Sequence, residues 1–265
     1  MDDLRQLRDL YGEPRPGPGA QARVWRRVWG GRRRRLAWPV ALAVAATAFL
    51  LFGMVLTRST THDVPAPDGR SVLLAAATTA SVTGQDGAYW HIRKLHDDTR
   101  TTELWATRDG RAWKSERARQ GVDAPVRAVT DGSPFSIAGR DVTFEQIQNL
   151  PADPAALRTW MASMAPADLL ADALAGLLWS KPSPPAVRAA AYRALADLPE
   201  VRYLGGRTDT EGRDGEAFSF ALADGGRRTL IIDPGTSQVL AAVDDDGRSE
   251  VVLDVGWTDR APGRT

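Results

Sequence analysis

Residues 101–119 read TTELWATRDGRAWKSERAR, and this stretch predicts the antiparallel β-sheet on which the fold is built. Its centre, Asp109-Gly110, is a dipeptide typical of a two-residue hairpin turn. Trp105 and Trp113 stand at symmetric positions about that turn, so we expect the two rings to pair across the hairpin. The two predicted strands are residues 101–107 and 111–119.

The residues before this hairpin predict one more strand and a helix. Ala88, Trp90 and Ile92 alternate with polar neighbours, which is the two-residue period of a half-buried strand. Residues 71–82 are apolar and rich in alanine, and they predict a helix. After the hairpin, residues 121–150 contain only short apolar pieces, which we interpret as weak strands and loops.

The segment between residues 153 and 199 predicts three helices. Asp153 is a typical N-cap residue, and Pro154 suits the first helical position because its missing N–H would have no partner there. Apolar residues then recur at helical spacing in three stripes. The second stripe begins after Pro166, and the third begins at Ser183-Pro184.

After Pro199 the pattern returns to strands. Phe218, Phe220 and Leu222 alternate with other residues, and the turn sequences DPG at 233–235 and DG at 246–247 separate further apolar runs. These features are typical of successive antiparallel hairpins. Residues 70–265 are therefore predicted to form one α+β domain, an antiparallel and curved sheet with helices packed on one face. The polar, proline-containing residues 58–69 are predicted to be its linker.

The longest uncharged run, LAWPVALAVAATAFLLFGMVLT at residues 36–57, predicts a single transmembrane helix. As a helix it spans roughly 33 Å, which matches a hydrocarbon core of about 30 Å. A buried core helix and a cleaved signal peptide are the alternatives. Soluble helices rarely run this long without a polar face, and signal peptides have shorter apolar regions and small residues at the cleavage site.

The formal net charge of +1 conceals an asymmetry that predicts orientation. Residues 1–35 contain ten arginines and four acids, whereas residues 58–265 carry 24 basic and 29 acidic residues. The positive-inside rule then places residues 1–35 in the cytoplasm and the domain outside the cell membrane. This segment also supplies the residues expected at the membrane interface, namely Trp25, Trp29, Arg32, Arg33, Arg34, Arg35 and Trp38.

The first residues of the chain predict a short amphipathic helix. Leu4, Leu7 and Tyr11 recur at helical spacing, but an isolated helix of this length is only marginally stable. It would therefore need a cytoplasmic partner, the alternative being an unstructured terminus. The near balance of charge over the whole chain argues against a nucleic-acid partner.

Motifs for catalysis, cofactors or metals are not found in the sequence. There are no cysteines and only three histidines, and the sequence contains no nucleophile elbow, Ser-x-x-Lys, zinc motif or phosphate-binding glycine loop. His91, His96, Asp97 and Asp98 are better interpreted as a solvated strand end and turn than as metal ligands. We expect no enzyme activity and no cofactor. The tryptophans predicted to lie outside the membrane fill the core or line a pocket whose residues the sequence does not identify: Trp90, Trp105, Trp113, Trp160, Trp179 and Trp257.

Several short motifs together resemble a known family. A basic preamble and single span are followed by Tyr89-Trp90, LPADP at 150–154, RAAAYRALA at 188–196 and IDP at 232–234. This order is similar to that of uncharacterised actinobacterial single-pass membrane proteins, often encoded near extracytoplasmic-function sigma factors. The outer domain also resembles the LolA- and RseB-type half-barrel, in which a curved sheet wraps helices and can hold lipid.

The resemblance implies a membrane-anchored extracytoplasmic protein that binds or senses an unidentified ligand, with a link to sigma-factor or envelope-stress signalling. Its expected partners are the lipid bilayer, a lipid or envelope-protein ligand, and a cytoplasmic partner of residues 1–35. An envelope lipid or lipoprotein carrier, an assembly protein, and a cell-envelope hydrolase are the alternatives. An open groove between helices and sheet would favour binding, whereas clustered buried carboxylates in a cleft would favour hydrolysis.

Overall fold

The computed structural model describes residues 68–82, 84, 86–120 and 125–263. The chain divides into two units, residues 1–61 and residues 62–265, and every described residue belongs to the second. No helix among the described residues is long and apolar enough to cross a membrane. The predicted transmembrane helix, the predicted cytoplasmic segment and all seven predicted interface residues lie outside the described residues, and so they stay predictions.

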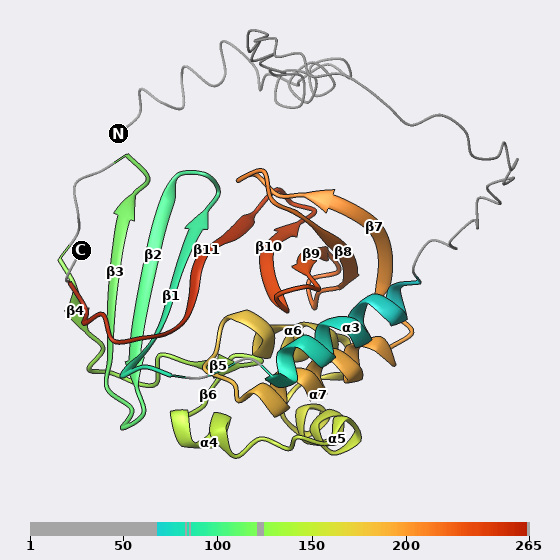
Figure 1. Ribbon diagram of the computed structural model, residues 1–265, viewed down its shortest axis with the longest axis horizontal. Coiled ribbons are helices and arrows are strands. Elements are labelled where there is room, and N and C mark those ends of the chain that lie inside the picture. Colours follow the sequence, from blue (N-terminus) through green and yellow to red (C-terminus); the bar gives the residue numbers. More distant parts are fainter. Residues whose placement is uncertain (1–67, 83, 85, 121–124, 264–265) are drawn as a thin grey trace, which may run out of the picture. The chain divides into compact units, whose positions relative to one another are not determined.

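The second unit is built on a large antiparallel sheet (Figure 1). Nine strands hydrogen-bond in the order β4-β3-β2-β1-β11-β10-β9-β8-β7, and a separate small sheet pairs β5 with β6. The strands are β1 (Tyr89–His96), β2 (Arg100–Thr107), β3 (Ala112–Ala118), β4 (Arg127–Ala128), β5 (Ser136–Ile137), β6 (Arg140–Asp141), β7 (Arg202–Thr208), β8 (Asp214–Ala221), β9 (Arg227–Asp233), β10 (Gln238–Asp244) and β11 (Ser249–Thr258).

Two meanders of consecutive hairpins make up the sheet, and one long-range pairing joins them. Strands β1 to β4 form the first meander and β7 to β11 the second. Strand β1 then pairs antiparallel with β11, so that Trp90 lies opposite Trp257. This pairing makes one curved sheet out of two locally formed halves (Figure 1).

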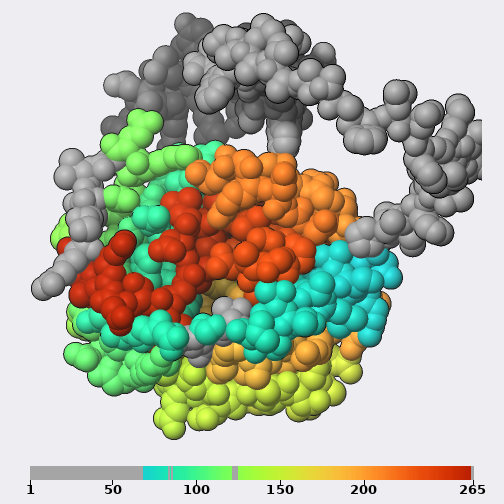
Figure 2. Space-filling model, viewed as in Figure 1, coloured from blue at the N-terminus to red at the C-terminus, as the bar shows by residue number. Residues whose placement is uncertain are grey.

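The helices follow the first meander and precede the second, except for α3, which comes first of the described elements. They are α3 (Gly69–Val82), α4 (Phe144–Gln148), α5 (Pro154–Met164), the short 3-10 helix η1 (Ala167–Leu169), α6 (Leu170–Trp179) and α7 (Pro185–Ala196). Helix α3 packs on α7, and its fully buried Ala76, Ala77 and Ala80 allow the two backbones to approach closely. Figure 2 shows α3 in cyan beside the orange strands of the second meander.

The main hydrophobic core lies between these helices and one face of the sheet. Leu174 and Leu177 of α6 pack with Phe218 and Phe220 of β8, and all four side chains are buried. The other face carries a smaller apolar cluster around Leu95 and residues of β9 to β11. The prediction of an α+β fold with a curved antiparallel sheet and helices on one face is therefore confirmed.

Most local predictions also hold, with two corrections. Trp105 and Trp113 are paired in the predicted register, but the turn between their strands has three residues, 108–110, with Gly110 at a φ of 84°. This is the arrangement that places glycine in a left-handed conformation after a tight turn. The segment 121–150 contains helix α4, which was not predicted, although Thr143 and Gln146 form a capping box that marks its start.

Candidate functional site

A groove of about 900 Å³ lies on the helix-facing side of β1 to β3. Its floor is formed by these strands, and its opposite wall is formed by residues 131–136 and by Ser180 and Lys181, which follow α6. In Figure 1 helices α3, α6 and α7 lie beneath the second meander, while β2 and β3 stand to one side of these helices. We call this cavity the lysine groove because Lys94, Lys114 and Lys181 line it.

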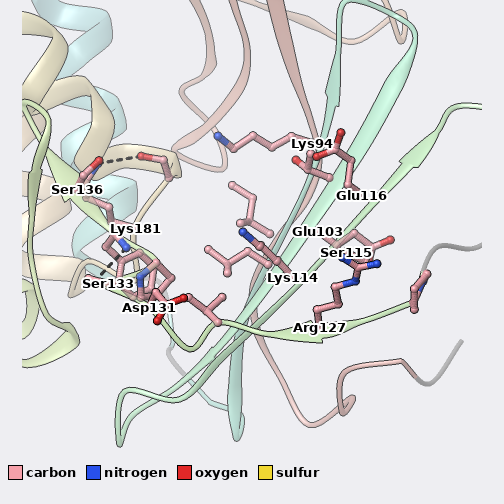
Figure 3. Close-up of a pocket in the computed structure, with 18 residues that line it drawn as sticks. Lys94, Glu103, Lys114, Ser115, Glu116, Arg127, Asp131, Ser133, Ser136 and Lys181 are labelled. Atoms are coloured by element: carbon pink, nitrogen blue, oxygen red, sulfur yellow. Dashed lines mark hydrogen bonds between the residues drawn. The ribbon is translucent and has the colours of Figure 1, made fainter.

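All three lysines of the chain line this groove. The sequence has 34 basic residues, of which only Lys94, Lys114 and Lys181 are lysines. They come from β1, from β3 and from the segment after α6, so they converge only in the folded chain. Figure 3 shows Lys94 and Lys114 projecting from the sheet into the space, with Lys181 on the facing wall.

The strand register explains why the floor is both apolar and charged. Ile92, Leu104, Lys114 and Arg127 lie opposite one another in a row across β1, β2, β3 and β4. Residues directly opposite in an antiparallel sheet share one face, so this row presents two apolar side chains followed by two cations. Neither Lys114 nor Arg127 forms an ion pair within the described residues, and both are exposed.

The next row of the floor is polar throughout. Lys94, Thr102 and Glu116 lie opposite one another there. The Nζ atom of Lys94 donates to Glu250 at 2.9 Å and lies 4.4 Å from the ring centroid of Trp179. Its charge is therefore held by a carboxylate and by an aromatic face. Glu116 is paired with Arg100, with 3.1 Å between oxygen and nitrogen.

Lys181 is the most perturbed ionisable group of the groove. Burial, together with the nearby ammonium of Lys94, lowers the pKa of Lys181 to about 8, although the charge of Asp172 acts in the opposite direction. Its Nζ atom donates to the Ser180 hydroxyl at 3.0 Å and approaches the Gly176 carbonyl at 3.4 Å. No carboxylate pairs with Lys181 in the described part of the chain. On folding, its amine therefore loses its hydrogen bonds to water and gains only a few protein acceptors in return.

The buried carboxylates lie elsewhere. Asp209 accepts from Arg213 at 2.7 Å, and Asp244 accepts from Arg228 at 2.7 and 3.0 Å. Neither Asp209 nor Asp244 lines the groove, whose carboxylates are those of Glu103, Glu116 and Asp131. Glu103 is paired with His91 and Glu116 with Arg100. Absence of enzyme activity stays a prediction.

The histidine and aspartate residues considered as metal ligands lie on β1, which carries His91 and His96, and in the turn after it, which holds Asp97 and Asp98. His91 lies on the face opposite the groove, where its ring stacks on Trp105 at 4.8 Å and contacts Glu103 and Asp254, each at 3.2 Å. His96 contacts Thr102 at 2.8 Å. Within the ranges that the structure describes, no group of three or more such residues is placed to hold a metal ion.

The tryptophans divide between core and cavity walls. Trp90, Trp105 and Trp179 are buried, and Trp160 packs against the main core. Trp90 and Trp257 line a smaller recess, described below. The pocket residues could not be identified from the sequence, because the residues that line the groove come from separate segments of the chain.

Comparison with known proteins gives distant structural matches only. No family model and no curated protein matches the sequence. Among solved structures, a MucA/MucB complex of Pseudomonas aeruginosa matches with a TM-score of 0.31 and 12% identity over 73% of this chain and 58% of that chain. A structure of MucB in complex with MucA(peri) matches with a TM-score of 0.30 and 14% identity over 73% of this chain and 57% of that chain.

The chain thus spans less than two thirds of the length of these solved structures. Likeness at this distance does not define a shared fold, and the family resemblance seen in the sequence stays a prediction. The sequence-based expectation and the structure agree on the curved antiparallel sheet with helices on one face.

Proposed function

We propose that residues 70–265 form a binding module that captures an extended acidic polypeptide segment in the lysine groove. The observation that carries this proposal is the convergence of the three lysines and Arg127 on one open cavity of about 900 Å³. The volume lies near the upper end of the range of about 300–1,000 Å³ that ligand sites span, so the cavity can hold a short extended segment of a partner.

Charge favours an acidic ligand. Lys114 and Arg127 lie directly opposite each other, and like charges in this position destabilise a sheet. Lys181 adds a third cation with no ion-pair partner among the described residues. A carboxylate-bearing ligand would replace this repulsion with attraction, and so its binding would gain electrostatic free energy that a neutral ligand could not gain.

The floor favours a polypeptide over an acyl chain. The apolar row of Ile92 and Leu104 is followed immediately by the polar row of Lys94, Thr102 and Glu116. An acyl chain lying along the strands would have to cross this polar row without hydrogen bonds, at a desolvation cost. An extended peptide presents side chains on one face every two residues, about 6.6 Å apart, which matches the spacing of successive rows of a sheet.

The cellular setting that we propose rests on the sequence. A single span at residues 36–57 would anchor the module to the cell membrane, with residues 1–35 in the cytoplasm and the groove outside. The ligand would then be a segment of an envelope protein. A link to sigma-factor or envelope-stress signalling is the finer proposal, and it rests on the family resemblance and on the short N-terminal peptide. Protease treatment of intact spheroplasts tests the orientation, since it should digest residues 58–265.

The chain's own lysines provide the test of the ligand. In full-length protein in neutral detergent, labelling with lysine carrying ¹³C at Cε gives three side-chain signals, which lysine-to-arginine variants assign. The probe is a synthetic peptide of alternating Glu and Leu, and the control peptide has Gln in place of Glu. We expect the acidic peptide to shift the Lys114 signal saturably, and the control peptide to leave it unchanged.

A double variant, K114Q/R127Q, should weaken binding of the acidic peptide by about tenfold or more, which is about 1.4 kcal/mol. The matched control is R158Q/R207Q, which removes two exposed cations that do not line the groove. Equal binding of both peptides would refute the proposal. If vesicles of anionic lipid shift Lys114 and the acidic peptide does not, the lipid-carrier alternative replaces it.

A further inference from the structure

A second and smaller cavity adjoins the lysine groove at Lys181. It is a recess of about 70 Å³ between the start of α7 and the strands β10 and β11. Two tryptophans, Trp90 and Trp257, form part of its wall, and it reaches solvent near the exposed Gln238. The volume takes several water-sized atoms, since one buried water needs about 10–15 Å³, but it excludes a large ligand.

Arg188 of α7 lines this recess and is poorly compensated for a buried guanidinium. One of its terminal nitrogens donates to the Ser237 carbonyl at 2.7 Å, and the hydroxyl of Ser237 lies 3.2 Å from that nitrogen. Its Nε atom is buried without a hydrogen-bond partner. No carboxylate pairs with Arg188 in the described ranges, and burial lowers its pKa. A buried unpaired cation is costly unless an anion binds beside it.

Lys181 brings a second cation to the same recess. Its amine is accommodated because residue 176 is glycine, and a Cβ atom there would lie 2.9 Å from Nζ. Gly176 lies inside α6, where glycine costs about 1 kcal/mol relative to alanine. Helix α6 thus has a residue of low helix propensity at the position where the Lys181 amine packs against it.

The lining of the recess contains two cations. Among the described residues that form it there is no Asp or Glu, in contrast to the lysine groove, where Glu103, Glu116 and Asp131 contribute. Two unlike cationic residues, one with a planar guanidinium and one with an ammonium, thus line the same small volume. This is the chemistry of a site for a tetrahedral or planar oxyanion.

We propose that the recess between Lys181 and Arg188 binds a small oxyanion, a phosphate or sulfate group that is either free or the terminal group of a larger molecule. The guanidinium Nε–H and the lysine ammonium are the donors, and the aromatic walls exclude water from the bound anion. This inference does not depend on the acidic-peptide function, because the recess and the groove share only Lys181.

The test uses full-length protein in neutral detergent with lysine labelled by ¹³C at Cε. Sodium sulfate and sodium phosphate are added at constant ionic strength, with chloride as the replaced anion. We expect a saturable shift of the Lys181 signal and an upward movement of its titration midpoint from about 8, because an adjacent anion favours the ammonium form. The Lys114 signal should stay unchanged.

Variants localise the anion. R188Q and K181Q should each weaken sulfate binding at least tenfold, as measured by calorimetry, and K114Q should leave it unchanged. Y192F is the matched control for R188Q, because Tyr192 also donates to the Ser237 carbonyl, at 2.9 Å, but carries no cation. Sulfate binding that survives in Y192F and fails in R188Q supports an oxyanion site at the guanidinium.

Three results would overturn the inference. One is a Lys181 signal that does not respond saturably to either anion, and another is equal sulfate binding by wild type and R188Q. The third is loss of sulfate binding in K114Q with retention in R188Q, which would place the anion in the lysine groove. Terminal phosphate on a larger molecule is distinguished from the free ion by comparing phosphoserine with inorganic phosphate. Failure of peptide binding alone would refute the proposed function and leave the oxyanion site standing.

Discussion

Lys114 of β3 and Arg127 of β4 lie directly opposite each other on the groove face of the sheet, and neither is paired with a carboxylate within the described residues. Natural sheets usually place opposite charges in such positions, because like charges there are destabilising. Like charges in this position cost free energy in the unliganded protein, and under the proposed function an acidic ligand would offset that cost.

The first prediction concerns this pair. Replacing Lys114 by Glu should create a cross-strand ion pair with Arg127 and stabilise the free domain by about 0.5 kcal/mol. The same change should abolish binding of the acidic peptide. Urea denaturation and peptide titration check the two effects together, and a variant that is destabilised yet still binds would contradict the role assigned to this pair.

The second prediction concerns pH and Lys181. Its pKa is about 8 in the folded chain and near 10.5 in an exposed lysine, so between these values the unfolded chain binds more protons than the folded chain. The contribution of Lys181 to the free energy of unfolding therefore becomes more favourable as pH rises from about 8 to 10.5. This contribution is lost as pH falls through 8.

Replacing Lys181 by Met should accordingly raise the melting temperature at pH 7 by more than at pH 10.5. Melting curves of wild type and variant at the two pH values give the difference directly, with other titrating groups cancelling. The same protonation should make sulfate binding stronger at pH 7 than at pH 9.5. Identical pH profiles for wild type and K181M would show that Lys181 is not perturbed.

A third prediction concerns the ion pairs that join helix to sheet. Arg228 of β9 donates to the buried Asp244 at 2.7 and 3.0 Å and to Asp172 of α6 at 2.7 Å. Arg228→Gln should cost about 2–3 kcal/mol, because it leaves the carboxylate of Asp244, only 6% exposed, with weaker compensation. Asp172→Asn should cost less than about 1 kcal/mol, because this carboxylate is 34% exposed. Chemical denaturation of both variants ranks the two changes.

The fourth prediction concerns Gly176. A Cβ atom at this position would lie 2.9 Å from the Lys181 amine, which is the movable end of a flexible side chain. Gly176→Ala should leave unfolding free energy within about 1 kcal/mol of wild type, since helix propensity offsets the displacement. Sulfate binding should weaken. Gly206→Ala, where an added Cβ would lie 3.9 Å from the Gly215 carbonyl oxygen, is the control and should not affect sulfate binding.

Local structure was largely predictable because it depends on neighbours in the chain. Asp153 caps α5 as expected, its side chain accepting from the Ala156 N–H at 2.8 Å. The hairpins followed from their Asp-Gly turns, and Trp105 faced Trp113 as predicted. Helix α4 was missed only because its capping box of Thr143 and Gln146 was not used as a start signal.

The candidate sites were not predictable in the same way. Lys94, Lys114 and Lys181 are separated by up to 87 residues in sequence, and no spacing rule connects them. Their meeting depends on β1 pairing with β2 and β11 while α6 packs beneath the sheet. The recess likewise needs Arg188 of α7 to approach the segment after α6.

The sequence by itself determined the elements, the α+β class and the charge asymmetry, because backbone preferences, hydrophobic period and charge counts are properties of short segments. Only the tertiary structure decided that β1 closes on β11, that three lysines share a groove, and that two cations face a recess without an acid. Those features depend on distances between residues far apart in the chain, which are set by packing of the whole core rather than by any local preference.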